Sequence, residues 1–457
     1  MKRTTRMLIL AAVLAVVVIG YTAVSRLITG QDEADVDGGD ISVTSHDLMA
    51  IEKLEWEYNG EKITLSKEGG RWRYAKDGAF PLDLNKVETM LSAIQEIKAS
   101  RSIEQIDSLS EYGLEEPGCK ITVGTLEGSK FTYHVGDKNE VTGEYYLLTG
   151  QSEKVYMVDS GLHNAFSKTL MDMVQRQEIP DLSSAKEIMI ETHDSLKKIV
   201  YKDTHKGITY TNAYKWFYEF DVEGNIVYSP LGSNKVRRLQ SSVSDITWKG
   251  CVDYDATNDE LANYGLDRPR VVVNVKYSNG DFNLMFGDQV DDNCYAKTGD
   301  TGIVYLVSTD VVEELISVDF ESLRPDDVCL MEWNTVDSIE IEVDGKALTI
   351  YFDRSNEGAV SYIVNGYQGD AEAVENLLDS ITGMTSVEQT DKASPFKEPE
   401  VRIVFHRNTE FFHTMTLSLF KFNSQSYLVE FDGQSRLLVG NDDVFELKEA
   451  FAELADQ

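Results

Sequence analysis

One helix pattern repeats three times along this chain, and it constrains the fold more than any other feature of the sequence. The first copy carries Leu84, Val87, Leu91 and Ile94 at offsets 0, 3, 7 and 10, which places all four on one face of an α-helix. The same spacing recurs in two later sets: Val236, Leu239, Val243, Ile246 and Val374, Leu377, Ile381, Met384. A repeat at this period indicates tandem units that share one supersecondary structure.

A second motif confirms the duplication at the level of the sequence. Tyr-Gly-Leu-x-x-Pro occupies 112–117 and 264–269, in each case 28 residues after the first apolar residue of the helix pattern. In the third copy the corresponding segment is Pro395-Phe396-Lys397-Glu398-Pro399, which lacks the glycine. We interpret the motif structurally: the glycine ends a short helical turn in the left-handed conformation, the leucine returns to the core, and the proline opens the next strand.

Short alternating runs before and after each helix predict antiparallel strands. Asn59-Gly60 is a strong signal for a two-residue hairpin turn, because both positions require positive φ. The pairs Gly136-Asp137 and Gly287-Asp288 are predicted to be tight turns between strands. The fold class is therefore α+β, with three tandem, mainly antiparallel β modules, each with one or two helices, at 48–183, 184–332 and 333–457.

The N-terminal segment predicts a membrane location. Met7 to Val24 is uncharged and mainly apolar, and these residues as a helix would span about 27 Å, enough to cross a bilayer core. Lys2, Arg3 and Arg6 precede the segment, so the positive-inside rule keeps the stub 1–6 in the cytoplasm. We expect a transmembrane signal anchor at 7–24 that contacts membrane lipid, then an acidic spacer at 25–47, with the bulk of the chain outside a bacterial cell membrane. Ala23-Val24-Ser25 leaves cleavage open.

The charge balance excludes one class of partner. The chain has 43 Lys and Arg against 78 Asp and Glu among its 457 residues, a formal net charge of −35. Such a chain repels nucleic acid, so no nucleic-acid partner is expected. Four cysteines, too far apart for a disulfide framework, leave buried thiols or a single bridge open: Cys119, Cys251, Cys294 and Cys329.

The common catalytic motifs are missing from the sequence, and the seven histidines are scattered with no pair spaced i, i+4. We therefore expect no enzyme, no cofactor and no assigned metal site. One weak calcium candidate is an acidic run whose carboxylates could equally cap the helical turn that follows it. Its members are Asp253, Asp255, Asp259 and Glu260.

An aromatic run offers a weak ligand candidate. If 214–220 is a strand, Tyr214, Trp216 and Tyr218 share one side, where they could stack on sugar rings. Burial in a sheet core is the alternative interpretation of the same three residues.

The order of these features resembles the bacterial domain-of-unknown-function 4340 family. The resemblance rests on the anchor, the opening strands at 51–66, the helix at 83–97, the motif at 111–117 and the segments 136–139 and 143–146. It implies a membrane-tethered extracytoplasmic protein of a kind often encoded beside ABC transporters of the gliding-motility type. It carries over no functional residue.

From the residues and the resemblance together, we expect a non-enzymatic, membrane-anchored extracytoplasmic protein that binds a partner, as an accessory component of an ABC transporter complex. The alternative is a module that binds cell-wall glycan or another extracellular ligand.

Overall fold

The computed structural model describes residues 41–150, 152–204, 206–355 and 360–455. The predicted stub 1–6, the predicted anchor 7–24 and residues 25–40 of the predicted spacer lie outside the described residues. The chain divides into two compact units, Met1–Gln175 and Arg176–Gln457. Among the described helices, none has both the length and the apolar character needed to span a bilayer.

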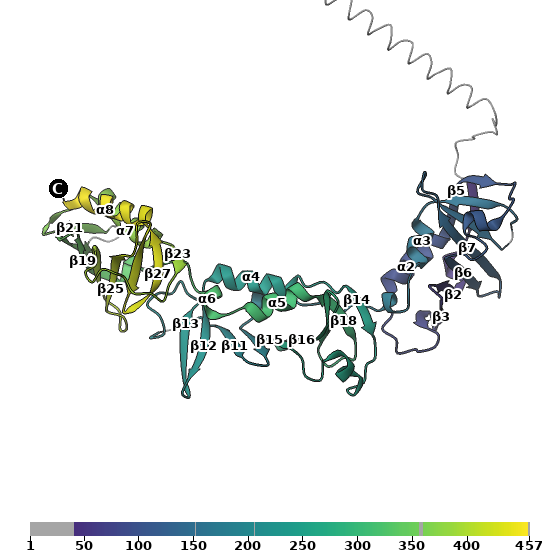
Figure 1. The fold of residues 1–457 in the computed structure, drawn as a ribbon, viewed down its shortest axis with the longest axis horizontal. Coiled ribbons are helices and arrows are strands. Elements are labelled where there is room, and N and C mark those ends of the chain that lie inside the picture. Colours follow the sequence, from purple (N-terminus) through teal and green to yellow (C-terminus); the bar gives the residue numbers. More distant parts are fainter. Residues whose placement is uncertain (1–40, 151, 205, 356–359, 456–457) are drawn as a thin grey trace, which may run out of the picture. The chain divides into compact units, whose positions relative to one another are not determined.

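The first unit holds one module and the second unit holds two, each built on a nine-stranded sheet (Figure 1). The first module contains β1 (Ile41–Ser45), β2 (Ile51–Tyr58), β3 (Glu61–Glu68), β4 (Arg71–Tyr74), α2 (Leu84–Gln95), β5 (Glu96–Ile103), β6 (Cys119–Thr125), β7 (Lys130–Lys138), β8 (Tyr145–Thr149), β9 (Val155–Val158) and α3 (Gly161–Phe166). The second contains β10 (Glu187–Thr192), β11 (Leu196–Tyr201), β12 (Trp216–Val222), β13 (Asn225–Pro230), α4 (Ser233–Ser244), β14 (Gly250–Asp253), β15 (Val271–Tyr277), β16 (Gly280–Val290), β17 (Asn293–Thr298), β18 (Val304–Ser308), α5 (Thr309–Ser317) and α6 (Phe320–Leu323). The third contains β19 (Val336–Val343), β20 (Lys346–Asp353), β21 (Ser361–Val364), β22 (Tyr367–Gln368), α7 (Ala371–Gly383), β23 (Ser386–Gln389), β24 (Val401–Arg407), β25 (Thr414–Lys421), β26 (Ser426–Phe431), β27 (Gln434–Gly440) and α8 (Asn441–Ala455).

The three sheets share one strand order. The second sheet runs β13-β12-β11-β10-β15-β16-β17-β18-β14, and the third runs β22-β21-β20-β19-β24-β25-β26-β27-β23, position for position the same. The first sheet, read from β4, follows this order without the outermost strand and adds β1 beside β5 at the opposite edge. The third module, whose sequence motif is eroded, therefore keeps the full topology, and the prediction of three antiparallel α+β modules is confirmed.

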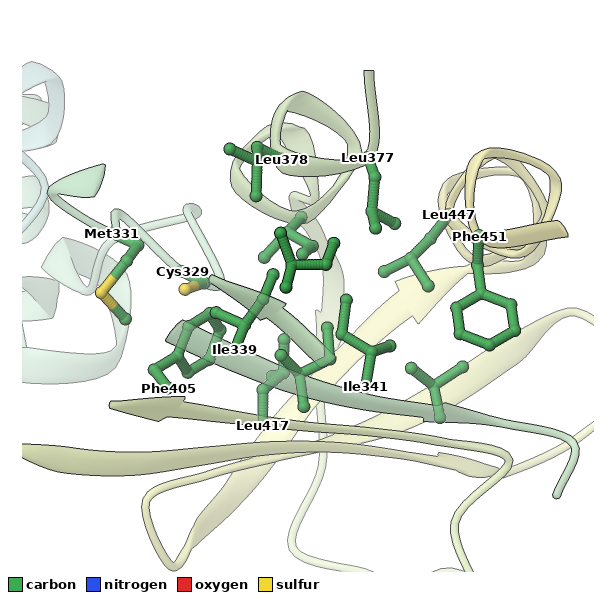
Figure 2. Close-up of a cluster of buried hydrophobic side chains, with 14 of the residues drawn as sticks. Cys329, Met331, Ile339, Ile341, Leu377, Leu378, Phe405, Leu417, Leu447 and Phe451 are labelled. Carbon is green, nitrogen blue, oxygen red and sulfur yellow. The ribbon is translucent and has the colours of Figure 1, made fainter. Parts of the chain in front are cut away.

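Helices cover one face of each sheet. In the third module α7 and α8 contact each other and pack over the sheet (Figure 2). Leu377, Leu447 and Phe451 are buried in the same core as Ile339 and Ile341 of β19. Between those two isoleucines Glu340 is exposed, as the period-2 alternation of a strand requires when only one face is covered.

The helix starts agree with the sequence in part. The Asp83 carboxylate accepts a hydrogen bond from the Asn85 amide at the start of α2, as expected of an N-cap. At the start of α4 the N-cap is Gly232, which makes no side-chain capping bond, and the helix begins at Ser233.

The Tyr-Gly-Leu motif adopts the predicted conformation in both copies. Gly113 and Gly265 have φ of 63° and 65°, and each ends a short 3-10 helix (Leu109–Tyr112 and Glu260–Tyr264). Leu114 and Leu266 follow and are buried. Glycine is needed here because a side chain at this φ costs about 1 kcal/mol or more.

The prediction that the Gly-Asp pairs form turns is wrong. Gly136 lies inside β7 and Gly287 inside β16, each at a shift in strand register. A Cβ on Gly136 would stand 2.1 Å from the carbonyl oxygen of Tyr112, and a Cβ on Gly287 would stand 2.0 Å from that of Tyr264. The Gly-Asp pair and the Tyr-Gly-Leu motif of each module therefore contact each other. The strand bulge that holds the Gly-Asp pair packs directly on the backbone of the Tyr-Gly-Leu turn.

Gly136→Ala and Gly287→Ala should each destabilise their module by about 1–3 kcal/mol, because the added methyl overlaps a fixed carbonyl oxygen. Gly118→Ala and Gly250→Ala are the matched controls, because open space surrounds both positions. Thermal unfolding of the full chain measures the difference; equal melting temperatures for the two pairs would contradict the contact.

The last residues of the predicted spacer are folded. Ile41–Ser45 forms β1, which pairs antiparallel with β5, and the structure therefore corrects the spacer prediction at 41–47. His46 follows, only 7% exposed, and its imidazole Nε2 hydrogen-bonds the Tyr133 hydroxyl. Burial lowers the pKa of His46 below its usual 6.5, because the charged imidazolium loses its hydration.

Because the folded state holds His46 neutral, the unfolded chain binds protons more readily below pH 6.5. The edge formed by β1 and β5 should therefore lose stability as pH falls from about 7 toward 5. Hydrogen exchange of peptides from these two strands measures this loss. His46→Gln should make the pH dependence shallower, and an unchanged slope would count against this assignment.

Candidate functional site

A cavity in the second unit lies where the second and third modules of the chain meet. Its volume is about 560 Å³, within the range typical of small-molecule sites. Six aromatic residues line it, four from the second module and two from the third: Tyr210, Tyr214, Tyr228, Phe320, Phe412 and Phe431. A few polar side chains, among them Arg324, Asp327 and Asp432, complete the wall.

A carboxylate from the segment between the modules holds the loop that carries Tyr210 and Tyr214. Glu332 accepts hydrogen bonds from the Asn212 backbone amide, from Asn212 Nδ2 at 3.1 Å and from Thr211 Oγ1 at 3.2 Å. The Leu330 amide also donates to the Tyr210 hydroxyl at 2.9 Å. These bonds fix one wall of the cavity against the start of the third module.

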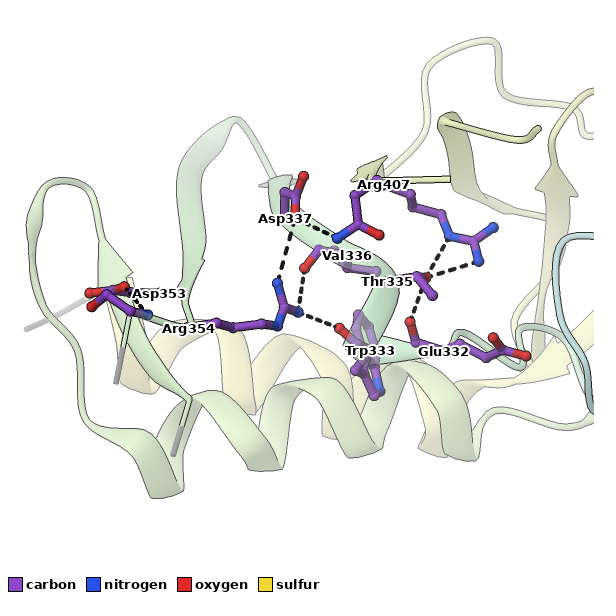
Figure 3. Close-up of polar contacts among 10 residues, drawn as sticks. Glu332, Trp333, Thr335, Val336, Asp337, Asp353, Arg354 and Arg407 are labelled. Atoms are coloured by element: carbon purple, nitrogen blue, oxygen red, sulfur yellow. Dashed lines mark hydrogen bonds and ion pairs between the residues drawn. The ribbon is translucent and has the colours of Figure 1, made fainter. Parts of the chain in front are cut away.

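A buried arginine supports the same segment from the other side (Figure 3). Arg407 is 7% exposed, and its guanidinium donates twice to Thr335 Oγ1, at 3.0 and 2.9 Å. The Thr335 hydroxyl in turn donates to the carbonyl oxygen of Glu332 at 2.7 Å. Burial lowers the pKa of Arg407, and the Glu332 charge opposes that shift.

Arg354 also stabilises the segment that leads into β19, through hydrogen bonds to its backbone. Its guanidinium donates to the carbonyl oxygens of Trp333 and Val336 at 2.7 and 2.6 Å (Figure 3). The backbone from Glu332 to Val336 is therefore held by two arginines of the third module.

The hydroxyls of Tyr210 and Tyr214 in the cavity wall are neutral. Tyr210 and Tyr214 share a hydrogen bond, and burial raises the pKa of both far above the usual value. The neighbouring charge of Asp327 raises the pKa of Tyr214 further, since a phenolate beside a carboxylate is disfavoured.

One cavity residue has an unusual backbone. Phe412 has φ of 55°, a conformation that bulky residues rarely adopt. Such strain persists only where the surroundings impose it, and it concentrates at functional sites.

The three aromatic residues predicted as a stacking platform are separated in the structure. Tyr214 precedes β12 and lines the cavity, whereas Trp216 packs on Tyr201 and Tyr218 packs on Phe320. All three are buried, at 5%, 8% and 9% exposure. They do not form one exposed face, because the sheet and α6 cover them.

Two carboxylates of the calcium candidate, those of Asp253 and Glu260, make local turn contacts. Asp253 accepts from the Asp255 amide and the Tyr264 hydroxyl, and Glu260 accepts from the amide and hydroxyl of Thr257. No group of three or more His, Cys, Asp or Glu side chains suited to a metal ion occurs in the described part of the chain. Asp259 precedes the 3-10 helix without a side-chain capping bond.

All four cysteines are free thiols, namely Cys119, Cys251, Cys294 and Cys329. Burial raises the pKa of Cys119 and of Cys329 to about 12, so both are unreactive core residues.

The sequence analysis missed five of the six aromatic residues of the cavity, namely Tyr210, Tyr228, Phe320, Phe412 and Phe431. These residues come from five separate segments of two modules, and no spacing in the sequence links them. Only Tyr214, inside a dense aromatic run, gave a signal.

A family model for a domain of unknown function, DUF4340, matches residues 72–215 and 229–399, more than half of the chain. The chain belongs to the DUF4340 family. Each DUF4340 match begins inside one module and ends inside the next, so the bounds of the family model do not coincide with those of the folded modules. No curated protein and no solved structure matches the chain.

Glu332→Ala should release the loop at 209–214 and lower the free energy of unfolding of the second unit by about 1–3 kcal/mol, because it removes three hydrogen bonds to a charged acceptor. The exposed helix residue Glu375 offers the control: Glu375→Ala should change stability by less than about 0.5 kcal/mol. Chemical denaturation measures the free energy of unfolding of both variants. Equal effects would contradict the stabilising role of the Glu332 hydrogen bonds.

Proposed function

We propose that this chain is a non-enzymatic, membrane-anchored extracytoplasmic protein that binds a partner within an ABC transporter complex. The predicted anchor at 7–24 and the family resemblance favour this proposal. Three modules of one topology also suit a binding protein, since such arrays present repeated surfaces for recognition.

The observation that carries the partner proposal is an exposed apolar edge in the second module. β12 and β13 form a hairpin around Glu223-Gly224, and the outer strand β13 has one unpaired backbone edge. Figure 1 shows this hairpin extending from its module. Val222 and Val227 stand on the same face of the hairpin, 53% and 46% exposed, and Ile226 is 49% exposed.

An apolar edge strand of this kind pairs readily with a strand from another protein. Backbone hydrogen bonds would supply affinity and the valine side chains would supply contact area. We therefore assign β13 as the docking edge for an extracytoplasmic strand of a transporter subunit.

The test is a mild-detergent pull-down of tagged full-length protein from its native host, read by mass spectrometry. A permease and an ATPase should co-purify, and the double change Val222→Ser and Val227→Ser should reduce their recovery at least about tenfold, since each buried valine contributes about 1.5 kcal/mol or more. Val387→Ser, on the edge strand β23 and 65% exposed, is the control.

Recovery of the wild-type protein without transporter subunits would contradict the partner proposal. Equal recovery from the hairpin variant and the control would keep the transporter and reject β13 as the contact.

A second candidate function is the binding of an extracellular ligand. The junction cavity favours it, because a sizeable pocket with aromatic walls and a few polar groups is the usual form of a small-molecule site. Cell-wall glycan is one ligand class that aromatic walls can accommodate, by stacking against sugar rings.

A further inference from the structure

We propose that the cavity between the second and third modules binds an organic cation, with a quaternary or alkylated ammonium group placed among its aromatic rings. The proposal rests on the ligand-binding candidate above and names the ligand class for that site.

The number of aromatic rings in the cavity wall favours a cationic ligand. Six aromatic rings line one cavity, and the negative face of each ring attracts a cation within about 6 Å of its centroid. The rings are held in place by one another: Tyr210 stands edge-on to Phe431 at 5.1 Å between centroids and to Tyr214 at 6.4 Å. A ligand would meet a preformed wall and would have little ordering to impose.

The second argument is that cations of the protein already stand over two of these rings. Lys202 Nζ lies 3.9 Å from the centroid of Tyr228, and the guanidinium carbon of Arg324 lies 5.9 Å from that of Phe320. Over the other four rings, no lysine or arginine from the described part of the chain is placed in this way: Tyr210, Tyr214, Phe412 and Phe431.

The third argument is the sign of the local charge. Asp327 and Asp432 both line the cavity, and Asp327 lies close enough to Tyr214 to act on its hydroxyl. Arg324, the only lysine or arginine among the described residues that line the cavity, is paired with Glu321 at 3.3 Å. With a net charge of −35 on the whole chain, the field attracts cations and repels anions.

Other ligand classes fit less well. A hydrocarbon chain would desolvate Asp327 without giving it a partner, which costs free energy. A neutral sugar would gain the stacking against the rings but would leave the charge of Asp327 unused. An alkylated ammonium group satisfies both features, since its methyl groups contact the rings and its charge faces the carboxylate.

The experiment compares two ligands of the same shape. Choline and 3,3-dimethylbutan-1-ol differ only in the charged nitrogen, so their affinity ratio isolates the electrostatic contribution. Calorimetric titration of the full-length protein, in a detergent without choline or sugar headgroups, should give choline at least about tenfold tighter binding. Its affinity should also fall as salt is raised. Equal affinities, or binding of a neutral trisaccharide and not of choline, would overturn the proposal.

Two variants locate the site. Asp327→Asn keeps the shape of the side chain and should weaken choline binding about five- to tenfold, and Phe431→Leu should do the same by removing a ring. Asp379→Asn and Tyr367→Leu alter exposed residues outside the cavity and should leave the affinity unchanged. Choline affinity that is indifferent to Asp327→Asn, in a variant with an unchanged melting temperature, would overturn the assignment even if Phe431→Leu fails to fold.

A sedimentation experiment distinguishes two sources of the cation, a wall polymer and a free solute. A cation attached to a wall polymer would sediment the protein with isolated wall material, and free choline would release it; binding in solution without sedimentation indicates a free solute. Both results support the ligand class. Transporter recovery in the pull-down does not depend on choline, so failure of the cation proposal and failure of the partner proposal are distinguishable.

Discussion

Each module depends on one constraint: a nine-stranded antiparallel sheet buries a single face under its helices. The two edges of each sheet stay in contact with solvent, and they carry exposed apolar side chains in places, such as Val222 and Val227 of the β12–β13 hairpin and Val387 of β23. Because side chains fill the core of each module, the interior leaves little room for a ligand. The candidate site is instead a cavity that lies where two modules meet. The location of both candidate surfaces follows from this one-sided packing.

The junction in the second unit is held by a small number of polar contacts around Glu332. Its carboxylate holds the loop that carries Tyr210 and Tyr214, and its carbonyl oxygen accepts the bond from Thr335 that Arg407 supports. Burying an arginine costs free energy unless its donors form hydrogen bonds. The two bonds to Thr335 offset part of this cost for Arg407. The same contacts that join two modules also shape the cavity wall, which links stability at the junction to ligand binding.

The sequence predicts the repeated architecture well, because repetition and periodicity are local signals. The three helices, most strands and the left-handed Gly113 and Gly265 follow from spacing and turn signals. The sequence does not predict why Gly136 and Gly287 are glycines, because the carbonyl oxygens that exclude a Cβ come from a distant turn. It also does not predict the cavity, whose rings converge only after two modules have folded and met. The sequence did not predict the pairing of β1 with β5, because an acidic, Gly-rich stretch next to β1 dominates the local composition.

Binding of an organic cation at the junction of the two modules of the second unit can be measured by hydrogen–deuterium exchange of the full-length protein titrated with tetramethylammonium. Protection should be confined to peptides that cover 208–214, 320–332 and 428–434. Protection elsewhere in the chain, or none at saturating cation, would rule out binding at the junction.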